Sequence, residues 1–202
     1  MDTAARRREY QRASDEGWLP FFVAAGSTYA VRPEVLMGIA SRETNMGGPR
    51  QPDGRYHWLA QPGDGGDGFG LMQIDRRSFP EWVGRGNWKS AEAGIEKGAE
   101  VLRAKRDGIR ARAGTQAIVR DRHTDEVYRF VYPAFTEDGL EKAAVAAYNV
   151  GELWVGYHAS KGRDVDHGTT GRDYSSDVLA RAAQFRVWLV ADGWITEGNQ
   201  SA

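Results

Sequence analysis

Glu43 is the residue whose type and position in this sequence best suit acid catalysis. It follows Ile39 by four residues and Ala40 by three, so a helix places it on its own apolar stripe. Loss of solvation raises the pKa of a carboxyl group, and a general acid that works at neutral pH needs a raised pKa. The alternative is a structural glutamate at a helix end, paired with Arg42 or Arg50.

A glycine-rich segment supplies further carboxylates. Residues 63–75 read GDGGDGFGLMQID, and five glycines among residues 63–70 exclude a helix and let the backbone approach a ligand closely. Glycoside hydrolysis generally uses two carboxyl groups across the bond: one protonates the leaving oxygen, and the other positions water or attacks. The segment therefore suits the side of a sugar cleft that faces an acid. Two alternatives are a surface hairpin with solvated aspartates and a calcium loop, although the spacing does not fit an EF-hand.

Two later segments place polar groups at helix ends. Residues 146–151 read AAYNVG, so Tyr148 and Asn149 lie where a helix ends and their hydroxyl and amide groups can reach a cleft. Residues 166–182 read DHGTTGRDYSSDVLARA, which is typical of a loop followed by a capped helix. Taken alone, each of these segments is also an ordinary helix boundary.

The elements that position these groups are mostly helical. The sequence predicts a charged helix over residues 3–16 and a short apolar one over 20–30. Further helices are predicted over residues 33–44, 90–113, 136–149 and 174–192. Pro33 suits a first helical position, Thr136 an N-cap and Gly193 a helix stop. Glycine, proline and aspartate make residues 46–68 a loop or hairpin, followed by a short strand over 69–74. Residues 116–132 are ambiguous but favour strand, with a turn at 122–125.

Composition limits the classes of function. The 202 residues carry a net charge of −1, which does not suit a nucleic-acid binder, and no cysteine, which excludes disulfides and thiol catalysis. The histidines lack metal-ligand spacing; they are His57, His123, His158 and His167. No apolar run is long enough to insert into a membrane, and no apolar region of a signal peptide follows Arg6–Arg8.

Taken together, the four segments resemble those of goose-type lysozymes, which form glycoside hydrolase family 23 with the soluble lytic transglycosylases. Residues 39–44, IASRET, are similar to the family's Ser-Arg-Glu-Ser segment, and residues 68–75, GFGLMQID, to its Gly-x-Gly-Leu-Met-Gln-Val-Asp segment. Residues 147–151, AYNVG, are similar to Ala-Tyr-Asn-Ala-Gly, and residues 168–182 follow the family's Gly-Thr-Thr to Ala-Arg segment without a gap. The order along the chain also agrees, and the resemblance spans residues 20–192.

The resemblance implies a role for each matching residue. Glu43 is the catalytic acid, and Asp75 with Asp64, eleven residues earlier, matches the two aspartates implicated in holding the attacking water. The matching substrate-binding residues are Gln73, Tyr148, Asn149 and Tyr174. The sequence departs from the family where Phe79 replaces a histidine. Residues 110–135 have no counterpart in the short goose-type pattern, and this insert could form a flap over the cleft, a wall-binding element or a dimer surface.

The resemblance implies a mainly α, lysozyme-like (α+β) fold with a small β-hairpin lining the substrate cleft. We expect a single catalytic domain over residues 1–202, with an N-terminal helical segment over about 1–30. The implied activity is a muramidase that hydrolyses the β-1,4 bond between N-acetylmuramic acid and N-acetylglucosamine with inversion, without a cofactor or metal. The aspartate pair favours hydrolysis over the lytic transglycosylase alternative, and the presence of Glu43 over a non-catalytic wall-binding module.

The partner that we expect is peptidoglycan, with no nucleic acid and no membrane insertion, and the protein as a monomer. Without a signal peptide, we expect synthesis in the cytoplasm and action on the wall after release or delivery. Such a protein is a phage or prophage endolysin or, as the alternative, a protein delivered by a secretion machine. One predicted helix face is basic, through Arg103, Lys105, Arg106, Arg110 and Arg112. We expect a solvated face there, with contact to phosphate-rich wall polymers as the alternative.

Overall fold

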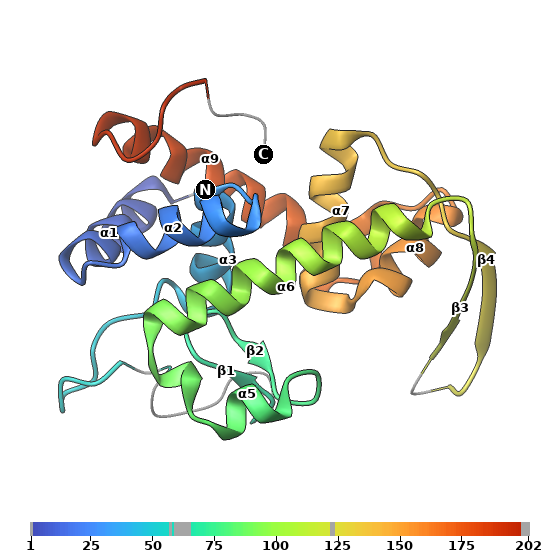
Figure 1. The fold of residues 1–202 in the computed structure, drawn as a ribbon, viewed down its shortest axis with the longest axis horizontal. Coiled ribbons are helices and arrows are strands. Elements are labelled where there is room, and N and C mark those ends of the chain that lie inside the picture. The colour runs from blue at the N-terminus through green and yellow to red at the C-terminus, as the bar shows by residue number, and fades with distance from the viewer. Residues whose placement is uncertain (1, 57, 59–65, 122–123, 199–202) are drawn as a thin grey trace. The chain divides into compact units, whose positions relative to one another are not determined.

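The computed structural model describes residues 2–56, 58, 66–121 and 124–198 and is mainly helical (Figure 1). The α-helices are α1 Thr3–Asp15, α2 Leu19–Tyr29, α3 Pro33–Thr44, α5 Pro80–Gly84, α6 Ala91–Arg112, α7 Glu137–Val150, α8 Glu152–Ser160 and α9 Tyr174–Ala191. Short 3-10 helices are η2 Asn87–Lys89, η3 Val165–Gly168 and η4 Thr170–Arg172. Two antiparallel hairpins pair β1 Gly68–Phe69 with β2 Ile74–Asp75 and β3 Gln116–Arg120 with β4 Val127–Val131. The prediction of a mainly α fold with a small β-hairpin is confirmed.

Local signals set the helix boundaries as predicted. Pro33 begins α3, where its missing N–H costs no helical hydrogen bond. The hydroxyl of Thr136 caps α7 by accepting a hydrogen bond from the Gly139 amide at 3.2 Å. Gly193 follows α9 with a φ of +74°, a left-handed conformation that glycine adopts without strain.

The single strand predicted over residues 69–74 is wrong. The chain reverses direction within this segment, because Gly70 has a φ of +78° and Gln73 a φ of +49°. The Gln73 amide donates to the Gly70 carbonyl at 3.1 Å and closes the turn between β1 and β2. The sequence also did not predict α5 or α8.

The chain folds into two compact units, and the boundaries between them fall within α6 and α9. The first unit comprises the chain up to Glu100 together with the residues from Val178 onward. Its central element is α3, in which every residue from Glu34 to Ser41 is buried. The prediction of a single domain stays a prediction.

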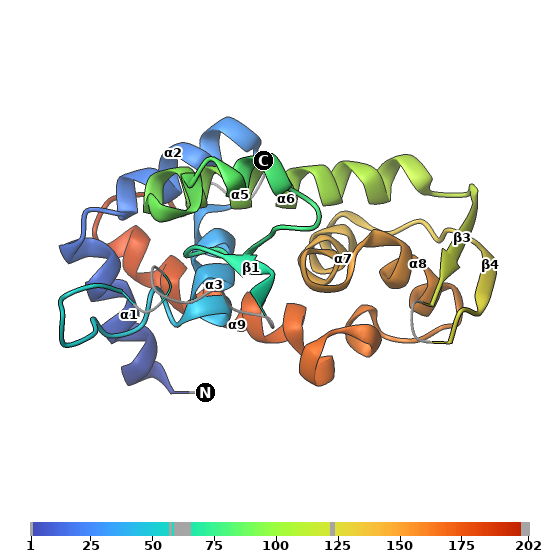
Figure 2. The same ribbon diagram turned by 90° about the horizontal axis from the view of Figure 1, so that it is seen from below.

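The second unit, Val101–Asp177, contains α7, α8 and the hairpin of β3 and β4. The hairpin packs on α8, as Figures 1 and 2 both show, with the Tyr128 ring centroid 4.7 Å from that of Tyr157. This hairpin confirms the strand interpretation of residues 116–132; residues 122 and 123 of the predicted turn lie outside the described residues. On the opposite face of the hairpin, Ile118, Val127 and Val131 are exposed.

Candidate active site

Glu43 lies in the last turn of α3 and is half-buried. The helix ends directly after it, because Asn45 adopts a left-handed conformation with a φ of +50°. The Asn45 amide donates to the Ser41 carbonyl at 3.0 Å, and the Met46 amide to the Ala40 carbonyl at 3.1 Å. The acid predicted from the sequence therefore stands at the end of a buried helix, partly removed from solvent.

A side-chain hydrogen bond joins this helix end to the first hairpin. The hydroxyl of Thr44 lies 3.0 Å from the carbonyl oxygen of Leu71, in the turn between β1 and β2, and also 3.0 Å from the Ala40 carbonyl of its own helix, so its one proton is shared between the two. The same hydroxyl accepts from the Gly47 amide at 3.0 Å. Leu71 and Met72 are fully buried, so the apolar tip of the turn is anchored in the core of the first unit. The structure thus brings the Glu43 end of α3 and the hairpin that carries Gln73 and Asp75 together.

Asp75 is held as a carboxylate at the end of β2. It accepts hydrogen bonds from the Ser78 hydroxyl at 2.7 Å and from the backbone and side chain of Arg77, each at 3.1 Å. Partial burial raises the pKa of Asp75, but the hydrogen bonds from Ser78 and Arg77 and the charge of Arg77 outweigh it, so this pKa lies below its ordinary value. Asp75 is therefore ionised at neutral pH.

The remaining predicted residues of this segment differ in what the structure says of them. Gln73 is half-buried, and its side-chain amide donates to the Gly70 carbonyl at 2.8 Å, which stabilises the turn. Asp64 lies outside the described residues. Asp67, the third carboxylate, pairs with Arg76 at 3.0 Å and with Arg77 at 3.5 Å.

Sequence reasoning missed the residues that hold Asp75. Arg77 and Ser78 follow it by two and three residues, and their contacts form a local turn around the carboxylate. A polar side chain two or three residues after an aspartate is the signal that could have identified them.

A hollow of about 360 Å³ is lined in part by Ser78, whose hydroxyl donates to the Asp75 carboxylate. The ammonium of Lys97 lies 4.2 Å from the centre of the Phe79 ring, a cation–π contact. The lining residues are Ser78, Phe79, Pro80, Glu81, Trp82, Arg85 and Lys97. Phe79, which departs from the family pattern, thus presents an aromatic surface next to the candidate base.

The other predicted binding residues lie in the second unit. The side-chain oxygen of Asn149, at the end of α7, accepts from the Thr170 amide at 3.0 Å and so holds the loop before α9. Tyr148 is half-buried, whereas Tyr174 is only 2% exposed. Substrate binding by these three residues stays a prediction.

Asp166 was not predicted as a site residue, and it organises the same loop. Its buried carboxylate accepts from the backbone and hydroxyl groups of Ser175 and Ser176 at 2.8–3.0 Å. Burial raises its pKa, but these hydrogen bonds outweigh burial and lower the pKa below its ordinary value. The negative charge at the start of α9 also suits the helix dipole.

The basic face of α6 is compensated within the second unit. Arg103 pairs with Asp107 at 2.7 Å, and Lys105 with Glu152 at 2.8 Å. Glu137 forms ion pairs with the guanidinium groups of Arg106 and Arg110. These pairs leave less charge for an anionic polymer than the sequence indicates.

Among the residues that the structure describes, no group of three or more His, Cys, Asp or Glu side chains could hold a metal ion. Over the same part of the chain, none of the helices combines the length and apolar character needed to cross a membrane.

Comparison with known proteins adds independent support for the motifs. The family model described as Lysozyme g matches residues 16–187. The chain is 36% identical to the lysozyme g of Takifugu rubripes over 165 residues, which are 80% of this chain and 70% of that protein. It is 33% identical to the lysozyme g of Struthio camelus over 80% of this chain and 62% of that protein. It is 30% identical to the lysozyme g of Cyprinus carpio over 92% of this chain and 82% of that protein.

Proposed function

The chain belongs to the goose-type lysozyme family and is a glycoside hydrolase of the muramidase type, and we propose that it cleaves peptidoglycan with inversion at the anomeric carbon. The bond cleaved is the β-1,4 bond from N-acetylmuramic acid to N-acetylglucosamine. The observation that carries the proposal is the hydrogen bond from Thr44 to Leu71, which ties the Glu43 end of α3 to the hairpin of Asp75.

In the proposed reaction, Glu43 gives its proton to the glycosidic oxygen while the bond from that oxygen to the anomeric carbon breaks. Water attacks the anomeric carbon from the opposite face and passes a proton to Asp75, which acts together with Asp64. An inverting pair of carboxyl groups is separated by roughly 6.5–9.5 Å, because the water lies between them. Asp75 is ionised at neutral pH and so can accept this proton, while the hydrogen bonds that lower its pKa also make it a weaker base.

The first test is Glu43→Gln, which keeps the shape of the side chain but has no proton to give. We expect the rate of peptidoglycan cleavage to fall by roughly 10²–10⁴-fold with little change in thermal stability. Glu92→Gln, at an exposed glutamate of α6, is the matched control and should keep full activity. A Glu43→Gln protein that clears cell walls at the wild-type rate would refute the assignment.

The second test separates hydrolysis from transglycosylation. We expect reducing sugar ends of inverted configuration, identified by mass spectrometry and by NMR of the fresh products. Asp64→Asn and Asp75→Asn should each retain measurable activity, and the double variant should lose far more, because groups that act as a unit are not additive. A folded, active double variant that yields 1,6-anhydro sugars would instead establish a lytic transglycosylase that uses Glu43 alone.

The endolysin setting and the monomeric state expected from the sequence stay predictions. Addition of the purified protein to intact cells and to permeabilised cells tests the first, and light scattering in solution tests the second.

A further inference from the structure

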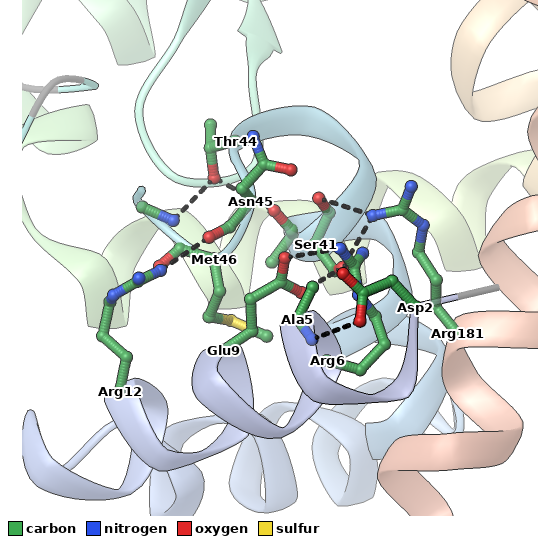
Figure 3. Close-up of polar contacts among 12 residues, drawn as sticks. Asp2, Ala5, Arg6, Glu9, Arg12, Ser41, Thr44, Asn45, Met46 and Arg181 are labelled. Atoms are coloured by element: carbon green, nitrogen blue, oxygen red, sulfur yellow. Dashed lines mark hydrogen bonds and ion pairs between the residues drawn. The ribbon is translucent and has the colours of Figure 1, made fainter. Parts of the chain in front are cut away.

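We propose that helix α1 positions the catalytic acid through three side chains, Arg6, Glu9 and Arg12, which together form the α1 clamp. Arg6 and Glu9 bind the hydroxyl of Ser41, two residues before Glu43, and Arg12 binds the carbonyl of Asn45, two residues after it. Figure 3 shows these contacts. The inference rests on the proposed function, because it takes Glu43 as the acid.

The first half of the clamp encloses Ser41, two residues before Glu43. Ser41 is fully buried, and its hydroxyl donates to Glu9 at 2.5 Å while it accepts from Arg6 at 2.7 Å. Arg6 and Glu9 form an ion pair of 2.9 Å, and both are buried. Arg181 of α9 also donates to the Ser41 hydroxyl and carbonyl, at 2.9 and 3.1 Å. The position of Ser41 is therefore determined by charged groups from two other helices.

The second half of the clamp binds the chain just after the acid. The guanidinium of Arg12 donates to the Asn45 carbonyl at 2.7 Å and to the Met46 carbonyl at 3.1 Å. Both residues have left-handed backbone conformations, with φ values of +50° and +53°, which L-residues adopt only when the surroundings hold them. Arg12 thus stabilises the strained turn that ends α3 and satisfies carbonyls near the helix terminus.

The chemistry of the clamp indicates positioning rather than stability. Burying an ion pair sacrifices hydration and often gives no net stabilisation over well-packed apolar side chains. Burial outweighs the Ser41 hydrogen bond and the charges of Arg6 and Arg181, so the pKa of Glu9 lies above its ordinary value. Burial of these polar groups therefore costs hydration that their mutual contacts offset. Hydrogen bonds are directional, whereas apolar contacts are not. The hydrogen bonds to Ser41 therefore fix the position of the α3 segment that carries Glu43 more precisely than apolar packing would.

The clamp residues precede the part of the chain that the family model matches. The family model matches residues 16–187, whereas α1 spans Thr3–Asp15.

A displacement of about 1 Å at a catalytic group can lower the rate by about 100-fold, so a helix that makes no contact with substrate can still control turnover. Arg6, Glu9 and Arg12 are therefore positioning residues.

The test compares Arg12→Gln and Arg12→Lys in the full chain on solubilised peptidoglycan glycan strands. We expect Arg12→Gln to lower kcat by about tenfold through a displacement of a fraction of an ångström. KM should stay within about twofold, because the substrate contacts are unchanged. Arg12→Lys keeps a cationic donor at the two carbonyls and should restore most of the lost kcat. Glu9→Gln keeps the shape of the side chain and should also lower kcat rather than raise KM.

Two matched controls lie on the same helix. Arg8→Gln removes an exposed arginine and should leave kcat unchanged. Tyr10→Phe breaks the 2.7 Å hydrogen bond from the Tyr10 hydroxyl to Asp192, so it loosens α1 away from Glu43 and should lower the melting temperature without lowering kcat.

Three outcomes overturn the inference. Arg12→Gln could keep the wild-type kcat, or it could change KM alone. The third outcome is that Tyr10→Phe, with a melting temperature equal to that of Arg12→Gln, loses as much kcat as Arg12→Gln does. If Glu9→Gln does not fold, the two Arg12 variants still decide the question. Failure of the proposed function is distinguishable, because it requires an active Glu43→Gln protein.

Discussion

Gly38, in the middle of α3, lies directly against α9. A Cβ atom at this position would lie 2.6 Å from the carbonyl oxygen of Val178 and 3.2 Å from Cγ1 of the same residue. Ordinary contacts between carbon and a carbonyl oxygen are about 3.3 Å or longer, so Gly38→Ala requires the two helices to separate by about 0.7 Å. The contact is with backbone, which cannot rotate away as a flexible side chain can.

The magnitude follows from two opposing effects. Overpacking in a core costs about 1–3 kcal/mol, and the backbone contact favours the upper end. Alanine in a helix regains about 1 kcal/mol over glycine, so we expect a net loss of about 2 kcal/mol in the free energy of unfolding. For a chain of this size that loss lowers the melting temperature by about 4–8 °C. Because Glu43 lies on the displaced helix, kcat should fall as well.

The assay is thermal and urea unfolding followed by circular dichroism, with kcat measured at a temperature where all variants are folded. Gly94→Ala in α6 is the matched control, since a Cβ there meets no atom within 4 Å. It should stabilise the protein by about 0.5–1 kcal/mol and leave kcat unchanged. Stabilisation by Gly38→Ala equal to that by Gly94→Ala would refute the close approach of α3 and α9.

Three further predictions concern polar groups. Asp166→Asn should lower the free energy of unfolding by about 1–3 kcal/mol, because an amide cannot accept all the hydrogen bonds of the buried carboxylate. The pKa of Asp166 is lowered, so its stabilisation is present above about pH 3.8 and lost as pH falls through the folded pKa; urea unfolding from pH 6 to pH 3 should show a shallower loss in the variant. Burial, together with the charges of His167 and Arg163, lowers the pKa of His158, so the free energy of unfolding should fall as pH drops below about 6.5. In His158→Gln, the urea midpoint should depend less on pH between pH 7.5 and 5.5 than in the wild type. Thr44→Val, which removes the hydroxyl that joins α3 to the hairpin, should lower kcat while Thr44→Ser preserves it; equal kcat in the two variants would contradict this link.

Signals within a few residues were enough to locate most helices. A proline at residue 33, a capping hydroxyl at Thr136 and a glycine at residue 193 act on their own turns of the chain, so their effect can be predicted without knowledge of the neighbours. The motifs around Glu43 and Asp75 could also be recognised from the sequence, because each is a continuous run of residues.

The sequence did not predict elements whose formation depends on packing against distant parts of the chain. α8 contacts α7, η3 and both strands of the second hairpin, so it is buried from several directions and carries no single apolar stripe that would have predicted it. The turn between β1 and β2 was mistaken for strand because its residues are apolar, and they are apolar because the tip of the turn is buried.

The burial of charge depended entirely on tertiary structure. Residues 3–16 are typical of a solvated, charged helix, and no spacing in the sequence relates Arg6 and Glu9 to Ser41, which lies 35 and 32 residues away. Desolvation of a side chain is determined by whatever packs over it, and here that is a helix distant in sequence. The sequence could therefore propose Glu43 as the acid, whereas the contacts of α1 with Ser41 are visible only in the folded chain.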